Sequence, residues 1–139
     1  MSDTIDPPIV NLAAAQRVVA AAVAEVERGG LASCVAVSGA AGDLKAIFRM
    51  DGAPRLSAAV AMEKAYTVAA FGLPTHAWWD VIKMSRRFSM ASKTARLIVF
   101  GGGVPLVVDG RQVGAVGGSG GSAEEDRRMA EAGAAAVSA

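Results

Sequence analysis

Cysteine and histidine each occur once in the chain, as Cys34 and His76. A structural zinc site needs four ligands from Cys, His or acidic side chains, so zinc fingers built on Cys and His are excluded. A single cysteine also excludes an intramolecular disulfide. Cys34 lies in an apolar stretch, and we interpret it as a small core residue.

An excess of charge of either sign is also missing, because 14 basic and 13 acidic residues give a net charge of +1. This balance does not favour nucleic acid or an anionic membrane as a partner. No apolar run approaches the roughly 18 residues of a transmembrane helix. The acidic, proline-broken start (MSDTIDPPIV) does not resemble a signal peptide. We therefore expect a cytoplasmic protein with no nucleic-acid partner and no membrane partner.

What the chain does have is alanine and glycine. Hydrophobic residues make up 53% of its 139 residues but aromatic residues only 5%, and 16 residues are glycine. This composition indicates a globular protein with closely packed backbones, and the length suits one domain of the usual ~100–200 residues. Pro7 and Pro8 block regular structure. We expect residues 1–8 to form a flexible arm and residues 9–139 a single domain.

Hydrophobic periodicity and turn residues predict an alternation of helices and antiparallel strands. Ser122 and Glu125 fit a helix capping box, and Asp109-Gly110 fits a two-residue hairpin turn. The expected helices are 12–28, 55–71, a short one through 78–81, and 122–137; the expected strands are 31–38, 44–49, 96–100, 106–108 and 112–117. This order predicts an α+β domain with helices packed on an antiparallel sheet.

A glycine-rich segment, Gly118-Ser119-Gly120-Gly121-Ser122-Ala123, matches the Gly-x-Gly-x-x-Ala pattern of dinucleotide-binding domains. Only 16 residues follow it, which leaves no room for the second half of a Rossmann unit. We interpret the segment as a tight turn between a strand and a helix. Anion binding at the helix N-terminus is the alternative.

A basic segment follows a pair of tryptophans, Trp78 and Trp79. Residues 81–100 contain Lys83, Arg86, Arg87, Lys93 and Arg96 and no acidic residue. Arginine forks bind carboxylates and flat rings stack, so a planar anionic ligand suits this combination. A solvated loop or a contact between subunits is the alternative.

Other single residues are candidates for chemistry. His76 is the one classical nitrogen ligand for haem iron and the one side chain that normally titrates near neutral pH. Lys64 lies in a helix that is apolar nearly all round, where it lines a pocket or belongs to a solvated stripe. Arg49 and Asp51 follow the second strand, where they bind backbone groups or lie at the mouth of a pocket.

Several of these residues occur in an ordered set of short motifs. The set is FRMDGA at 48–53, EKAYT at 63–67, FGLPT at 71–75, GGVPL at 102–106, DG at 109–110, VGA at 113–115, SGG at 119–121 and Asp126. In this order the chain resembles the GlcG/HbpS family (DUF336) of small haem-binding-like domains over roughly residues 9–137. Lys64, Thr75, Gly102, Gly103 and Asp126 match family positions.

The resemblance implies a profilin-like α+β fold with an antiparallel sheet of about five strands flanked by helices. It also implies homo-oligomers, haem binding in some members, and genes in catabolic operons in others. Fold is better supported than function by such a resemblance. Where this chain has Val37-Ser38, many members have Val-Val-Asp, and Gly118 replaces a usual valine.

Three functions remain open from the sequence. The first is a small-molecule-binding domain for haem or a similar planar anion, with haem iron held by His76 and the ligand contacted by Arg49, Thr75, His76, Trp78, Trp79, Arg86, Arg87, Gly102 and Gly103. The second is a catabolic isomerase, tautomerase or lyase that moves protons on a carboxylated or oxygenated ring, with Lys64, Asp51, Asp126 or His76 as acid or base. The third is a non-catalytic accessory oligomer.

Overall fold

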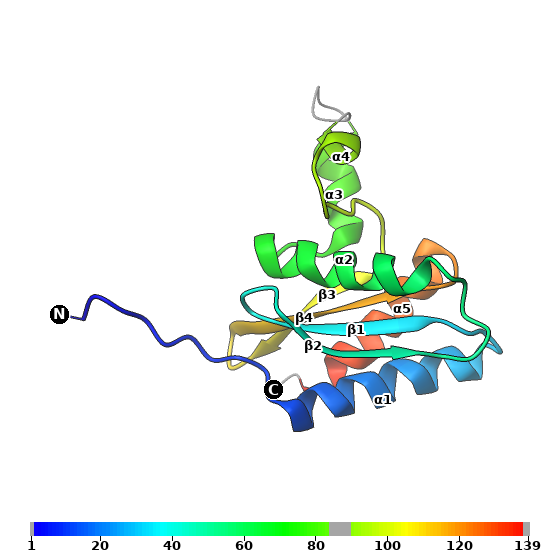
Figure 1. The fold of residues 1–139 in the computed structure, drawn as a ribbon, viewed down its shortest axis with the longest axis horizontal. Helices are drawn as coiled ribbons and strands as arrows, with labels where there is room; N and C mark the ends of the chain where they lie inside the picture. Colours follow the sequence, from blue (N-terminus) through cyan, green and yellow to red (C-terminus); the bar gives the residue numbers. More distant parts are fainter. Residues whose placement is uncertain (1, 84–89, 138–139) are drawn as a thin grey trace.

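The fold is described from a computed structural model that covers residues 2–83 and 90–137. In chain order its elements are α1 (Leu12–Arg28), β1 (Cys34–Gly39), β2 (Leu44–Arg49), α2 (Ser57–Phe71), α3 (Thr75–Ile82), α4 (Met90–Lys93), β3 (Gly103–Val108), β4 (Arg111–Ser119) and α5 (Ala123–Ala135). The α+β class predicted from the sequence is confirmed, with helices on an antiparallel sheet (Figure 1).

The sheet has four strands in the order β2-β1-β4-β3, and each neighbouring pair is antiparallel. The expectation of about five strands is therefore corrected for the described residues. The missing strand is 96–100, where Arg96 adopts a left-handed φ of 64°. The Thr67 hydroxyl lies 2.7 Å from Arg96 O and accepts a hydrogen bond from Ile98 N–H at 3.0 Å. This segment thus finds its backbone partners on α2, and the likeness to profilin remains an expectation.

The two faces of the sheet are packed differently. Helices α1 and α5 cover one face and α2 covers the other (Figure 1). The α1–α5 face buries a cluster of valines and larger side chains, among them Val18, Val35, Val37, Val116 and Met129. The α2 face buries small residues such as Cys34, Ala36 and Ala61. Small residues let the α2 backbone lie close to the central strands, and Cys34 is the core residue that the sequence predicts.

The structure confirms two local predictions, the helix capping box and the hairpin turn. Ser122 accepts a hydrogen bond from Glu125 N–H, and the Glu125 carboxylate accepts one from Ser122 N–H. Asp109 and Gly110 form the β3–β4 turn with φ values of 52° and 75°. The capping box fixes where α5 begins, and α5 forms one wall of the candidate site.

Helices α3 and α4 stand away from the sheet, beyond α2 (Figure 1). Trp78 and Ile82 of α3 form a small cluster with Leu97, and Ala91 of α4 packs against it. The N-terminal residues extend away from the body until Val10, which donates a backbone hydrogen bond to Val113 O at 2.9 Å. Across residues 2–83 and 90–137, no helix is both long enough and apolar enough to span a membrane.

Candidate functional site

Residues from four distant segments meet at the start of α5. They are Lys64 from α2, Thr75 and His76 from the first turn of α3, Gly102 and Gly103 before and at the start of β3, and Asp126 from the first turn of α5. The sequence predicted these residues separately, and the structure brings them together.

Lys64 and Asp126 form an ion pair inside this region. The side chain of Lys64 is fully buried, and its Nζ donates to Asp126 Oδ2 at 3.0 Å and to Gly118 O at 2.7 Å. The other carboxylate oxygen of Asp126 accepts from Gly121 N–H at 3.0 Å. Burial lowers the pKa of Lys64, and the neighbouring carboxylate of Asp126 opposes that shift. The pair joins α2, β4 and α5, and its hydrogen bonds offset the cost of burying two charges.

The space around the ammonium group of Lys64 is closed by glycine. Gly102 has a φ of 131°, and a Cβ there would collide with Lys64 Nζ and lie 2.7 Å from Gly118 O. A Cβ on Gly103 would lie 2.9 Å from both Lys64 O and Thr75 Cγ2. Gly103 N–H also donates to Thr75 Oγ1 at 2.8 Å. The two glycines and Thr75 therefore hold the start of β3 against α2 and α3.

His76 lies in an open cleft on the neighbouring side of the same segment. The cleft has a volume of about 340 Å³. Its lining residues come from α3, from the segment before β3 and from α5: His76, Trp79, Val99, Phe100, Gly101, Ala123, Glu124 and Arg127. The side chains of Trp79 and Phe100 are about half exposed, at 48% and 49%. The lining combines an imidazole, two flat rings, the Arg127 guanidinium and the Glu124 carboxylate, which suits a planar ligand whose acid group lies beside Arg127.

The imidazole of His76 has an unusual environment. Its Nδ1 is closed to solvent, yet it has no hydrogen-bond partner in the described part of the chain. Burial lowers the pKa of His76, the Arg127 cation lowers it further, and Glu131 and Asp80 oppose the shift. The imidazole is therefore kept neutral near pH 7, which is the form that binds a metal.

The Lys64–Asp126 pair and the His76 cleft are linked by Phe100. Lys64 Nζ lies 5.1 Å from the centroid of the Phe100 ring, which is within cation–π range. Phe100 in turn lines the His76 cleft. The same aromatic ring thus contacts the buried cation and lines the cleft.

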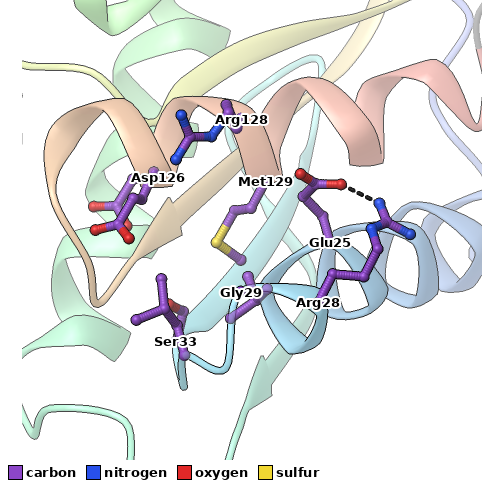
Figure 2. A pocket seen from close by; sticks show the side chains of 10 residues that line it. Glu25, Arg28, Gly29, Ser33, Asp126, Arg128 and Met129 are labelled. Carbon is purple, nitrogen blue, oxygen red and sulfur yellow. Dashed lines mark hydrogen bonds and ion pairs between the residues drawn. The ribbon is translucent and has the colours of Figure 1, made fainter.

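A second cavity, of about 270 Å³, lies between the end of α1 and the first turns of α5. Figure 2 shows Glu25, Arg28 and Gly29 on the α1 side and Asp126, Arg128 and Met129 on the α5 side, with Ser33 below. Arg28 and Glu25, both on α1, form an ion pair at the rim of this cavity. Asp126 lines this cavity and Arg127 lines the His76 cleft, so consecutive residues of α5 serve two different sites.

Other predicted residues lie elsewhere. Arg49 donates to Ala53 O, and Asp51 lies exposed on the turn after β2. Trp78 is buried against Ile82 and Leu97. Among the described residues these three side chains do not contribute to the His76 cleft. Arg86 and Arg87 lie outside the described residues.

Sequence reasoning missed most of the cleft, namely Val99, Phe100, Gly101, Ala123, Glu124 and Arg127. A signal for the α5 part was present. The capping box starts the helix at Ser122, and residues 123, 124 and 127 then fall on one face at helical spacing. The segment that contributes Phe100 carries no comparable signal, because its position depends on a hydrogen bond to Thr67.

Comparison with known proteins decides the family. The model of a family described as "Haem degrading protein HbpS-like" matches residues 10–135. The chain belongs to the HbpS-like family. Protein GlcG of Escherichia coli K12 is 34% identical over 110 residues, which are 78% of this chain and 80% of GlcG.

Solved structures of this family share the fold over nearly the whole chain. The crystal structure of the Klebsiella pneumoniae protein ORFY has a TM-score of 0.91 and 28% identity, and covers 99% of this chain and 96% of ORFY. The crystal structure of a PduOC:heme complex has a TM-score of 0.87 and 29% identity, and covers 93% of this chain and 95% of its own. The family recognised from sequence motifs is thus confirmed.

Proposed function

We propose that this HbpS-like domain binds haem, or a closely related planar anion, in the cleft lined by His76. The observation that carries the proposal is the imidazole itself. One of its nitrogens, Nδ1, is closed to solvent and has no partner among the residues that the structure describes, which leaves Nε2 for a ligand in the cleft. Imidazole is a standard axial ligand of haem iron, and a relative of known structure forms a haem complex.

The rest of the cleft fits the same ligand. Trp79 and Phe100 offer flat apolar surfaces to a macrocycle. Arg127, whose side chain is 48% exposed while it pairs with Glu131, offers a guanidinium to a propionate. The volume of about 340 Å³ is at the low end of the roughly 300–1,000 Å³ usual for ligand sites, so the cleft would hold one edge of the ring.

Haem, when bound, would supply the redox and oxygen chemistry of its iron. The chain's own residues would bind and orient it. His76 would hold the iron in its neutral form, the two rings would exclude water from one edge, and Arg127 would fix the acid groups. We propose that the domain does this as a homo-oligomer. Its cytoplasmic location and its lack of a nucleic-acid partner remain predictions.

A hemin titration followed at the Soret band tests this proposal. The wild-type chain should show a saturable shift near one haem per chain. His76→Ala should lose that shift or move its maximum, while Arg17→Ala, an exposed change on α1 outside the cleft, should bind like wild type. Circular dichroism of each variant checks that it folds.

Two results would contradict the proposal at different points. An unchanged spectrum in folded His76→Ala would show that another residue holds the iron. No saturable shift in the wild type at micromolar hemin would reject haem as the ligand.

A proton-transfer enzyme acting on a carboxylated or oxygenated ring is the second candidate. The buried Lys64–Asp126 pair favours it, because it places an amine and a carboxylate together, and burial lowers the pKa of Lys64 while Asp126 opposes that shift. For Lys64 to reach a substrate, Phe100 and the Gly101–Gly102 segment must move. If the hemin titration fails, carboxylated ring compounds should be screened with the wild type and with Lys64→Met.

A further inference from the structure

The cavity between the end of α1 and the first turns of α5 shares no lining residue with the His76 cleft (Figure 2). We call it the α1–α5 cavity. Its volume of about 270 Å³ lies just below the roughly 300–1,000 Å³ usual for drug-sized ligands, so it suits a smaller metabolite. Its lining residues are Glu25, Val26, Arg28, Gly29, Leu31, Ser33, Glu125, Asp126, Arg128 and Met129.

Ser33 has a hydroxyl group that the fold does not use. The residue lies directly before β1 and is only 2% exposed. Its carbonyl accepts a hydrogen bond from Met50 N–H at 3.0 Å, but its hydroxyl makes none with the residues that the structure describes. Gly120 passes close by, where a Cβ would lie 2.7 Å from Ser33 Oγ. A buried hydroxyl without a partner calls for an explanation, and a ligand in the cavity that Ser33 lines supplies one.

Asp126, on the α5 side of the cavity, also has hydrogen-bonding capacity left (Figure 2). The residue is 4% exposed. Its Oδ2 accepts from Lys64 Nζ, and its Oδ1 accepts from Gly121 N–H. A carboxylate offers about four lone-pair sites, so each oxygen can accept from a second donor. A donor group in the cavity can therefore bind Asp126 without breaking the pair with Lys64.

Arg128 supplies a cation on the same side of the cavity. Its side chain is 58% exposed, and its guanidinium lies 3.8 Å from the carboxylate of Glu124. That distance exceeds the about 2.7–2.9 Å of a charge-assisted hydrogen bond, so Arg128 keeps donors for another acid group. Arg28, by contrast, already pairs with Glu25 at the rim.

Charges of both signs line the α1–α5 cavity and balance. The charged lining residues are Glu25, Arg28, Glu125, Asp126 and Arg128. Three carboxylates and two guanidiniums leave one negative charge, and Lys64 cancels it from behind Asp126. Such a site favours neither a bare anion nor a bare cation. A molecule that carries one charge of each sign complements it better.

We infer that the α1–α5 cavity binds a small 2-amino acid with an apolar side chain. In this arrangement the carboxylate of the ligand pairs with Arg128, which suits the fork of a guanidinium. The ammonium group of the ligand donates to Asp126 and to Ser33 Oγ. Apolar surface for the side chain of the ligand comes from Val26, Leu31 and Met129.

Three ligands of matched shape test the inference on the full chain by calorimetric titration. L-Valine carries both charges, 2-hydroxy-3-methylbutanoate has a hydroxyl in place of the ammonium group, and isobutylamine has no carboxylate. L-Valine should bind saturably with a Kd below about 1 mM. Each of the other two should bind at least about tenfold more weakly, because it leaves one charged partner in the cavity unmatched.

Two variants place the binding in the cavity. Arg128→Gln should weaken L-valine binding at least about tenfold, and the exposure of this side chain makes the change safe for folding. Ser33→Ala should weaken binding severalfold, because it removes the hydroxyl and keeps the volume nearly unchanged. Arg111→Gln, an exposed change on β4 outside the cavity, is the matched control and should bind like wild type. Circular dichroism checks that each variant folds.

Three results would overturn the inference. The first is no saturable binding of L-valine at millimolar concentration, which would leave the cavity to water. The second is binding that neither Arg128→Gln nor Ser33→Ala weakens, which would place the ligand elsewhere. The third is equal binding of L-valine and either analogue, which would show that the site does not recognise both charges. The hemin titration concerns a cleft with other lining residues, so the haem proposal stands or falls separately.

Discussion

Lys64 and His76 both lie near Phe100, but their surroundings differ. Lys64 is fully buried, and its ammonium group donates to Asp126 and to Gly118 O. His76 borders an open cleft, and its buried Nδ1 is unpartnered among the described residues. Burial lowers the pKa of both side chains. A shifted pKa alone therefore does not separate a residue that serves the fold from one that serves a ligand.

The two side chains differ more clearly in whether their buried polar atoms are hydrogen-bonded. Most buried polar groups in proteins are paired, and an unpaired one calls for an explanation. The Lys64–Asp126 pair has its explanation inside the fold, where Gly102 leaves room for the ammonium group and Gly118 O accepts a hydrogen bond from it. The buried Nδ1 of His76 has no hydrogen-bond partner among the described residues, and the proposed ligand would bind the other ring nitrogen, Nε2, in the cleft.

The largest effect should come from breaking the buried pair. Lys64→Met leaves the Asp126 carboxylate buried without its cation, and we expect unfolding free energy to fall by about 3–5 kcal/mol. Urea denaturation followed by circular dichroism measures this loss. The double variant Lys64→Met/Asp126→Leu should recover much of it, because an apolar pair of similar volume removes the uncompensated charge.

A loss below about 1 kcal/mol in Lys64→Met would contradict a structural role for the pair. It would also strengthen the enzyme candidate, because a buried lysine that does not stabilise the fold would need another role, such as proton transfer.

The sequence predicted the local parts of this comparison and not the contacts that join them. The capping box at Ser122 and Glu125 and the turn at Asp109 could be predicted, because each depends only on residues that are close together in the sequence. The ion pair joins residues 62 positions apart. The segment 96–100 is apolar enough to predict a strand, but the hydroxyl of Thr67 holds its backbone instead. Such tertiary contacts leave no periodic signal in one sequence.

Thr75 lies between the two regions and should give an intermediate effect. Its hydroxyl accepts from Gly103 N–H at 2.8 Å, and the residue is fully buried. Thr75→Val keeps the shape but leaves this N–H unpaired, so unfolding free energy should fall by about 1–3 kcal/mol in urea denaturation. Thr94→Val, at an exposed position, should change it by less than about 0.5 kcal/mol. Equal losses in both variants would show that the Thr75–Gly103 bond adds nothing.

The smallest effect concerns the protonation of His76, the residue of the two that borders the open cleft. His76 is the one histidine in the sequence, so its ring protons give a single titrating set in proton NMR. Its pKa should lie below the ordinary 6.5, because burial and the Arg127 cation both disfavour the charged form. Arg127→Gln should raise that pKa, and Asp80→Asn should lower it, since Asp80 opposes the shift.

The sign of the linked pH dependence follows from this direction. Between the folded pKa and 6.5 the unfolded chain binds more protons than the folded chain, so stability rises with pH through that window. The contribution of His76 is complete above 6.5 and is lost as pH falls through the window. A pKa at or above 6.5 in the free protein would mean that the imidazole is solvated rather than held neutral. If His76 is the iron ligand, haem affinity must fall over the same range, because a protonated imidazole cannot bind iron.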